Sequence, residues 1–429
     1  LDSPGPTIQL LLNNLFPDLI LILATSWYSV LTPSMFSYSS LINGLLLTIM
    51  LLSALGTWLS IHKMSSAYNQ ASQNLPNSAL FVGALLVLFG LAPYYAIGYF
   101  MHEKFAPWNS RVALGSLLGA GLLVSYLFYA LVTNPRRQNI ALAILIATMA
   151  GWQVRNANEF RLSWNKQLTL YEQLSWRIPS LKENTAILSE QEILFFMGDY
   201  PTSFAINSIY GQPTQLSKQE IPYWFFPVSS TFWGKESLLA NGTPLSDTQH
   251  SVYFEGDSKK SILIRFEPQD NECLWVIRPG DAYSRAITPG EQLLAPSSDL
   301  SRITENITKS PLENILSSRS NQNWCYFYQK ADLARQFRRW EDIVHLWQQA
   351  EKLNKRPANG FEYIPFIEGY ANTGDWKTAR KLTDIANRIS PAMYHSLCPV
   401  WRNLYSTTPN SSIKDDQYQE VIHLLGCVP

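Results

Sequence analysis

The sequence predicts a polytopic α-helical membrane domain, followed by a soluble α+β domain and a C-terminal array of α-helical hairpins. Three observations support this fold class. Residues 1–154 contain several long apolar segments, whereas residues 155–429 have the composition of a soluble protein. Short β-rich runs alternate with turn residues within 181–320, and two helix–turn–helix units repeat at a fixed offset within 321–429.

The bulk composition limits the classes of function. A chain of 429 residues is long enough for two or three domains. Its formal net charge is zero and it has no long basic run, so we expect no nucleic-acid partner. The chain begins at Leu1 rather than Met, as a fragment or a processed product would, and its start lacks the pattern of a signal peptide.

The membrane domain is predicted to contain about five transmembrane helices. About 20 apolar residues are needed to cross the hydrocarbon core of a bilayer. The candidate spans are residues 16–35, 41–61, 80–101, 112–132 and 140–154. In the fourth, Gly115, Gly119 and Gly121 form a face of small residues, for which we expect tight packing inside one bundle rather than dimerisation.

The basic residues of the loops predict the orientation only weakly, because they do not separate cleanly between the two sides. The compact loop with Arg136 and Arg137 is assigned to the cytoplasm, which places the C-terminal half outside the plasma (inner) membrane. Arg111 enters the fourth span after a short aromatic loop. A cation there can contact a lipid phosphate, although such residues more often anchor a helix at the interface.

Residues 155–180 are predicted to form an amphipathic helix at the membrane interface. Their apolar side chains recur at steps of three and four residues, and Pro179 ends the pattern. Such a helix either lies on the membrane surface or packs on the following domain, and both positions fit the pattern. The face is formed by Phe160, Trp164, Leu168, Tyr171 and Leu174.

Residues 181–320 are predicted to form a small α+β domain. A strand is expected at 185–188 and a helix at 203–210. The β-rich runs 251–255, 261–267 and 272–278 are separated by turn residues, which predicts an antiparallel meander. The aromatic run YWFFPV at 223–228 is a candidate exposed functional surface.

Residues 330–357 and 366–391 contain two helix–turn–helix units that align with an offset of 36 residues. An aromatic side chain begins the second helix of each unit, and small side chains follow where the two helices cross. The paired positions, which we expect to pack the repeat, are Ala334 with Tyr370, Trp340 with Trp376, Ile343 with Ala379, and Ala350 with Ala386.

This pattern resembles the tetratricopeptide repeat, whose period is about 34 residues. The turn GDW at 374–376 matches that family, whereas Arg338 and Arg339 depart from it, because glycine is usual at this turn. The resemblance implies a surface for a protein or peptide partner and no reaction; a purely structural cap is the alternative. Because such arrays need about three units, we expect further helices around 324–328 and 394–404.

The four cysteines all lie in the C-terminal half, and none has the spacing of metal ligands, so we expect no metal site. Two disulfides are expected if this half faces an oxidising compartment, with Cys398–Cys427 the first pairing to test. Four buried free thiols are the slightly favoured interpretation. The remaining two cysteines are Cys273 and Cys325.

No catalytic or cofactor motif is recognisable, so no cofactor is expected and enzymatic activity stays open. The layout as a whole resembles multi-spanning membrane glycosyltransferases that use lipid-phosphate-linked sugars. In that family the catalytic carboxylate lies on the first extracytoplasmic loop, and here residues 37–40 contain no acid. The resemblance therefore implies a catalytic region upstream of Leu1.

Two classes of function follow from the sequence. The first is a bacterial integral membrane protein with an extracytoplasmic protein-binding or scaffold domain, whose partners are the lipid bilayer and a protein or peptide. The alternative is the C-terminal portion of a glycosyltransferase-like membrane enzyme.

Overall fold

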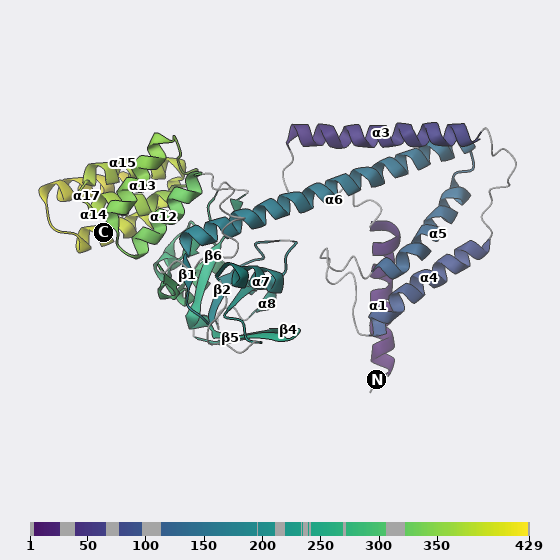
Figure 1. The fold of residues 1–429 in the computed structure, drawn as a ribbon, viewed down its shortest axis with the longest axis horizontal. Helices are drawn as coiled ribbons and strands as arrows, with labels where there is room; N and C mark the ends of the chain where they lie inside the picture. The colour runs from purple at the N-terminus through teal and green to yellow at the C-terminus, as the bar shows by residue number, and fades with distance from the viewer. Residues whose placement is uncertain are drawn as a thin grey trace. The chain divides into compact units, whose positions relative to one another are not determined.

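The computed structural model describes residues 4–25, 39–65, 77–96, 113–194, 196–210, 219–232, 234, 239, 242–268, 272–305 and 322–427. The chain divides into two compact units, Leu1–Leu162 and Ser163–Pro429, which are described separately (Figure 1).

Long apolar helices make up the first unit. Four helices among the described residues are long and apolar enough to cross a membrane, which indicates a membrane protein. They agree with the predicted spans except at their ends. The elements of this unit are α1 (Pro4–Ile20), the π-helical η1 (Leu21–Thr25), α3 (Ser40–Ser65), α4 (Asn77–Ala96), α5 (Leu114–Leu131) and the first part of α6 (Pro135–Arg177).

The first predicted span is only partly covered. Residues Leu12–Thr25 form a shorter apolar helix, and residues 26–35 lie outside the described residues. Arg111 and residues 97–101 of the third predicted span also lie outside them. The proposed lipid-phosphate contact of Arg111 therefore stays a prediction.

Glycines let α4 and α5 approach closely. A Cβ atom on Gly119 would lie 2.6 Å from the backbone oxygen of Gly83, and one on Gly90 would lie 2.5 Å from the carbonyl carbon of Gly115. Only glycine leaves room for this contact. Gly121 has open space around it among the described residues. The small-residue face thus packs inside the unit, as the sequence predicts.

The predicted boundary at residue 154 is wrong in one respect, because α6 continues without a break from Pro135 to Arg177. The apolar face of residues 155–180 is also divided. Leu168, Tyr171 and Leu174 are buried in the core of the second unit, whereas Phe160 and Trp164 are half exposed. The C-terminal part of this helix is therefore a core element, and its position at the membrane interface stays a prediction.

A four-stranded mixed sheet forms the centre of the second unit. Strand β2 (Thr185–Ser189) pairs in parallel with β3 (Tyr223–Pro227) on one side and with β6 (Ser261–Arg265) on the other. Helix α7 (Asp199–Tyr210) connects β2 to β3, and β7 (Trp275–Ile277) pairs antiparallel with β6. The strand order is β3-β2-β6-β7.

The predicted antiparallel meander is therefore wrong, although the β6–β7 pair was expected correctly. Strand β5 (Val252–Asp257) pairs with β4 (Pro244–Gln249) in a separate hairpin instead of with β6. Burial is the physical reason for this pairing. Strand β6 is buried on both faces, and such a strand is most stable beside another fully buried strand. A further two-stranded pair joins β1 (Ser180–Leu181) to β8 (Ile303–Thr304).

The aromatic run at 223–228 is not an exposed surface. It forms β3, all of whose residues are buried. Trp224 lies against Phe254 with the ring centroids 6.5 Å apart, so these side chains form core rather than a binding face. The remaining short helices are α8 (Val228–Thr231), η5 (Ser258–Lys260), η7 (Pro279–Tyr283), α10 (Pro289–Leu294), η8 (Ala295–Ser297), η9 (Leu300–Arg302), η10 (Gly360–Tyr363) and η11 (Pro391–Met393).

Three helical hairpins follow residue 322. The further helix expected around 394–404 is present as α16, whereas residues 324–328 are not a separate helix but the start of α12. In the first hairpin Arg338 adopts φ 57°, and 36 residues later Gly374 adopts φ 88°. The same left-handed turn is thus built once with arginine and once with glycine. The hairpins are α12 (Trp324–Gln336) with α13 (Trp340–Lys352), α14 (Ile364–Asn372) with α15 (Trp376–Ile389), and α16 (Tyr394–Thr407) with α17 (Ser412–Leu425).

Replacing Arg338 with Gly should raise the free energy of unfolding by about 0.5 kcal/mol, because the left-handed conformation strains a residue with a Cβ atom. The matched change Gly374→Ala should lower it by about 1 kcal/mol. Denaturant unfolding of the full chain in detergent, followed by tryptophan fluorescence, measures both. If both substitutions changed the free energy of unfolding in the same direction, the two residues would not occupy equivalent left-handed turns.

Candidate functional site

The residues predicted to pack the repeat lie between the helices of the first two hairpins. Trp340 is partly buried at the start of α13, and the other seven side chains are buried. Gly369 on α14 lies close to α13, because a Cβ atom there would be 2.7 Å from the side chain of Ile343. These residues hold the hairpins together.

The helical array contacts the rest of the second unit at three places. On α12, Gln329 donates a hydrogen bond to the carbonyl oxygen of Leu274 at 2.6 Å. On α16, the hydroxyl of Ser396 lies 2.7 Å from that of Ser284, which follows η7. Immediately before α14, the ring of Phe361 packs on Trp275 with the centroids 4.6 Å apart.

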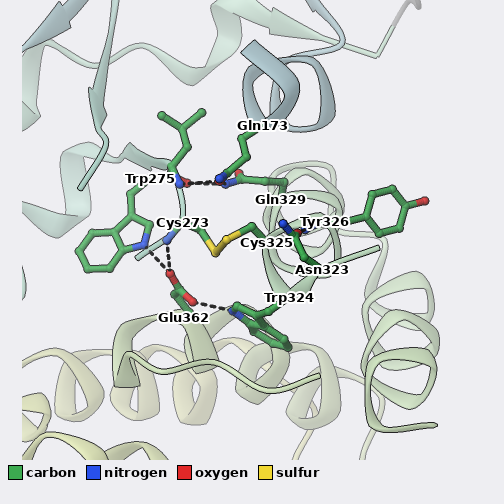
Figure 2. Close-up of a disulfide and its surroundings, with 10 residues drawn as sticks. Gln173, Cys273, Trp275, Asn323, Trp324, Cys325, Tyr326, Gln329 and Glu362 are labelled. Carbon is green, nitrogen blue, oxygen red and sulfur yellow. Dashed lines mark hydrogen bonds between the residues drawn. A yellow bond between two sulfur atoms is a disulfide. The ribbon is translucent and has the colours of Figure 1, made fainter. Parts of the chain in front are cut away.

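A disulfide and a buried carboxylate stabilise the contact between the helical array and the sheet (Figure 2). Cys273, just before β7, is bonded to Cys325 on α12. The carboxylate of Glu362 accepts hydrogen bonds from the backbone N–H of Cys273 at 2.7 Å and from Nε1 of Trp275 at 3.1 Å. It also accepts one from Nε1 of Trp324 at 2.5 Å, so it bridges both sides of the disulfide.

Burial raises the pKa of Glu362 to about 7, and the three N–H donors oppose that rise. The carboxyl group is fully buried, so desolvation of its charged form outweighs the hydrogen bonds. The group that joins the array to the sheet therefore titrates near neutral pH.

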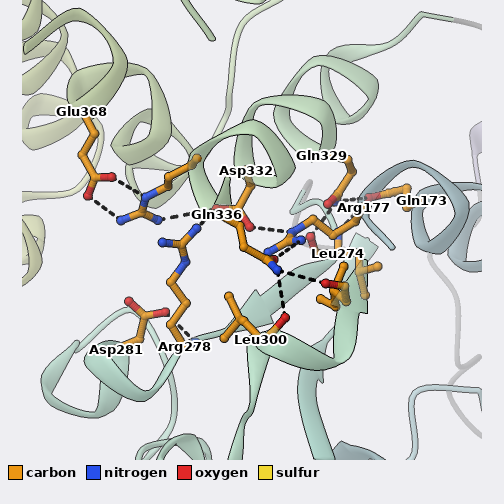
Figure 3. A network of polar contacts seen from close by, with 12 residues as sticks. Gln173, Arg177, Leu274, Arg278, Asp281, Leu300, Gln329, Asp332, Gln336 and Glu368 are labelled. Atoms are coloured by element: carbon orange, nitrogen blue, oxygen red, sulfur yellow. Dashed lines mark hydrogen bonds and ion pairs between the residues drawn. The ribbon is translucent and has the colours of Figure 1, made fainter. Parts of the chain in front are cut away.

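A network of charges around Asp332 on α12 also stabilises this contact (Figure 3). Its carboxylate accepts hydrogen bonds from Nε of Arg177 at the end of α6, at 2.7 Å, and from Nη2 of Arg278 after β7, at 2.9 Å. Arg335 lies 3.5 Å from Asp332 and binds both oxygens of Glu368 on α14 at 2.5 Å. Burial opposes ionisation of Asp332, yet the three guanidinium groups hold its pKa well below the usual range.

These contacts bury part of α12 and η10 against the rest of the second unit. The protein or peptide surface that the tetratricopeptide resemblance implies stays a prediction. Sequence reasoning missed Glu362 and Asp332, because neither belongs to a recognisable motif. A signal was present for Glu362, a lone acid within the apolar run FEYIPFI.

The cysteines correct one expectation and confirm another. The predicted Cys398–Cys427 pair is bonded and ties α16 to the end of α17. Four free thiols were the favoured interpretation, and this is wrong, because the chain's four cysteines form two disulfides.

Among the described residues of the first unit, Asp18 is a fully buried acid. Asp18 on α1 accepts a hydrogen bond from the hydroxyl of Tyr95 on α4 at 2.9 Å. The π-helical η1 begins three residues later, and Pro17 interrupts the backbone bonding of α1. Ionisable residues buried among membrane helices, and π-helical turns, occur often at functional sites.

Within the described residues no group of three or more His, Cys, Asp or Glu side chains could hold a metal ion. No family model, curated protein or solved structure matches the chain. The resemblances to tetratricopeptide repeats and to glycosyltransferases therefore stay predictions.

Replacing Asp332 with Asn should destabilise the second unit by about 3–5 kcal/mol, because three buried guanidinium groups would lose their shared counter-ion. Asp384→Asn is the control, since Asp384 pairs with the exposed Arg388 and such a pair contributes less than about 1 kcal/mol. Differential scanning calorimetry measures both. A small effect at Asp332 would show that the network does not hold the array in place.

The titration of Glu362 predicts that the stability of the second unit depends on pH. A native pKa of about 7 lies above the usual value of 4.5, so the stabilising contribution is full below pH 4.5 and is lost as pH rises through 7. Glu362→Gln should flatten this dependence. It should also lower stability by about 1–3 kcal/mol, because an amide N–H₂ would face the donor of Trp324.

Unfolding midpoints between pH 4.5 and 8 measure this effect, with the exposed Glu341→Gln as control. If the unfolding midpoints of Glu362→Gln depended on pH as those of the unaltered protein do, Glu362 would not be the group that makes stability depend on pH.

Proposed function

We propose that this chain is a bacterial integral membrane protein that holds a rigid, disulfide-bonded scaffold domain outside the plasma membrane. The observation that carries the proposal is the use of all four cysteines in two disulfides within the second unit. Disulfides persist in oxidising compartments and are rare in the cytosol. This supports an extracytoplasmic position for Ser163–Pro429, on the side that the loop with Arg136 and Arg137 also favours.

The rigidity of the scaffold follows from the contacts between the array and the sheet. The loop closed by Cys273–Cys325 spans 52 residues, and a bridge of that length stabilises a fold by about 4 kcal/mol in the chain-entropy account. The networks around Glu362 and Asp332 add contacts on either side of it. Such a domain is suited to presenting a surface of constant shape to a partner.

The outward-facing second helices of the hairpins are the surface that we assign to a protein partner. On α15, Lys377 and Lys381 are exposed and lie about 40° apart around the helix, whereas the exposed Arg388 is paired with Asp384. Two neighbouring lysines favour a partner with an acidic surface. Helix α12 is unsuitable, because Cys325 and Gln329 bind it to the β7 region.

Orientation is tested by cysteine labelling of intact cells, since the protein's own cysteines are bonded. Lys259→Cys, on the exposed η5, should react with a membrane-impermeant maleimide added outside. The matched variant Arg136→Cys, at the exposed start of α6, should react only after permeabilisation. The reverse pattern would refute the extracytoplasmic position.

The partner surface is tested by placing a photo-crosslinking amino acid at Lys381 or, as control, at Lys259. In native membranes the Lys381 variant should form one discrete crosslinked species, and adding Lys377→Glu should reduce its yield several-fold. Equal yields from both positions would argue against a specific surface on α15.

The glycosyltransferase-like function is a second proposal, which rests on the resemblance in layout and places the catalytic region upstream of Leu1. It is tested by the coding sequence upstream of Leu1. Further spans with an acid in the first outer loop would support an enzyme, and a start codon directly before Leu1 would count against it.

A further inference from the structure

A polar pocket of about 140 Å³ lies at the carboxyl ends of β2 and β6. The chain leaves β2 through α7 toward β3 on one side, and β6 pairs with β2 on the other. The strand order therefore reverses at this point, which is where open parallel sheets bind their ligands. The pocket is lined by Ser189, Glu190, Gln191, Ile193, Arg265, Phe266, Glu267, Thr288 and Glu291.

The only guanidinium group that lines the pocket is already neutralised. Arg265 donates from Nη1 to Glu291 at 3.0 Å and from Nε to Glu272 at 3.2 Å. The positive charge of Arg265 is therefore balanced by two carboxylates, so this guanidinium does not favour an anionic ligand. The lining residues carry three carboxylates and one guanidinium, so their formal net charge is −2.

Glu190 is the carboxylate that remains without a cation. It accepts a hydrogen bond from the hydroxyl of Thr288, and within the described part of the chain it forms no ion pair. Glu267 differs, because the ammonium of Lys166 lies close enough to interact with it electrostatically. The uncompensated negative charge is thus centred on Glu190.

The segment TPGE at residues 288–291 is built around this carboxylate. Thr288 and Glu291 cap one another, with Thr288 N–H donating to Glu291 at 2.8 Å and Glu291 N–H donating to the Thr288 hydroxyl at 3.1 Å. The other carboxylate oxygen, Oε1 of Glu190, lies against Gly290, where a Cβ atom would be 2.0 Å from it. The TPGE segment therefore contacts both oxygens of Glu190.

We infer that this pocket binds a primary ammonium group, with Glu190 as its counter-ion. Hydrogen bonds between an ammonium and a carboxylate are charge-assisted and strong, and Ser189, Gln191 and Thr288 offer further oxygens. A volume of about 140 Å³ holds roughly four or five water molecules, which suits the amine and the few atoms around it. An ethanolamine headgroup and an amino sugar share this chemistry.

The inference is independent of membrane orientation and of the partner surface on α15. It is tested on the full chain in phosphatidylcholine nanodiscs by isothermal titration calorimetry. Ethanolamine and glucosamine are the probes, and ethylene glycol and glucose are their neutral counterparts. At least one amine should bind at least tenfold more tightly than its neutral counterpart.

Glu190→Gln should weaken amine binding at least tenfold, whereas Glu255→Gln, at an exposed acid on β5, should leave it unchanged. Glu190→Asp keeps the charge and should retain more affinity than Glu190→Gln, which separates loss of charge from loss of folding. Equal binding of amines and neutral probes, or unchanged binding by Glu190→Gln, would overturn the inference.

The source of the amine is resolved by exchanging the nanodisc lipid for phosphatidylethanolamine. Competition with free ethanolamine would support a lipid headgroup as the ligand. Unchanged binding of the free amine would support a soluble one, and both outcomes are consistent with an amine site.

Discussion

The buried charge of Asp332 is the constraint on which the arrangement of the second unit depends. A carboxylate transferred from water to a protein interior loses several kcal/mol of hydration, and only a complete set of partners offsets that loss. Asp332 finds its partners on three separate parts of the chain: Arg177 at the end of α6, Arg278 after β7, and Arg335 on its own helix. Any displacement of the array from the sheet would leave these charges buried and unpaired.

The disulfide Cys273–Cys325 and the carboxylate of Glu362 act at the same contact by different physical means. The disulfide restricts the unfolded chain, whereas Glu362 collects three N–H donors that would otherwise be buried without acceptors. Together they make the helical array a fixed part of the sheet domain.

Elements that depend on neighbouring residues were predictable from the sequence. Apolar length gave most of the membrane helices, and the 36-residue offset placed the hairpins and their buried small residues. The pairing of Cys398 with Cys427 was also within reach, because the two lie 29 residues apart at the end of one small array. The separate interfacial helix was not correct, since polarity changes along α6 without any interruption of its backbone hydrogen bonding.

Local periodicity therefore determined most of the helices and several of the strands. Only the tertiary structure decided which strands are neighbours, which acids are buried and where a pocket forms. Arg177 and Asp332 lie 155 residues apart in the chain, and Glu190 and Thr288 lie 98 apart. A pattern within one segment cannot reveal such contacts, because their free energy depends on the water that both segments lose when they meet.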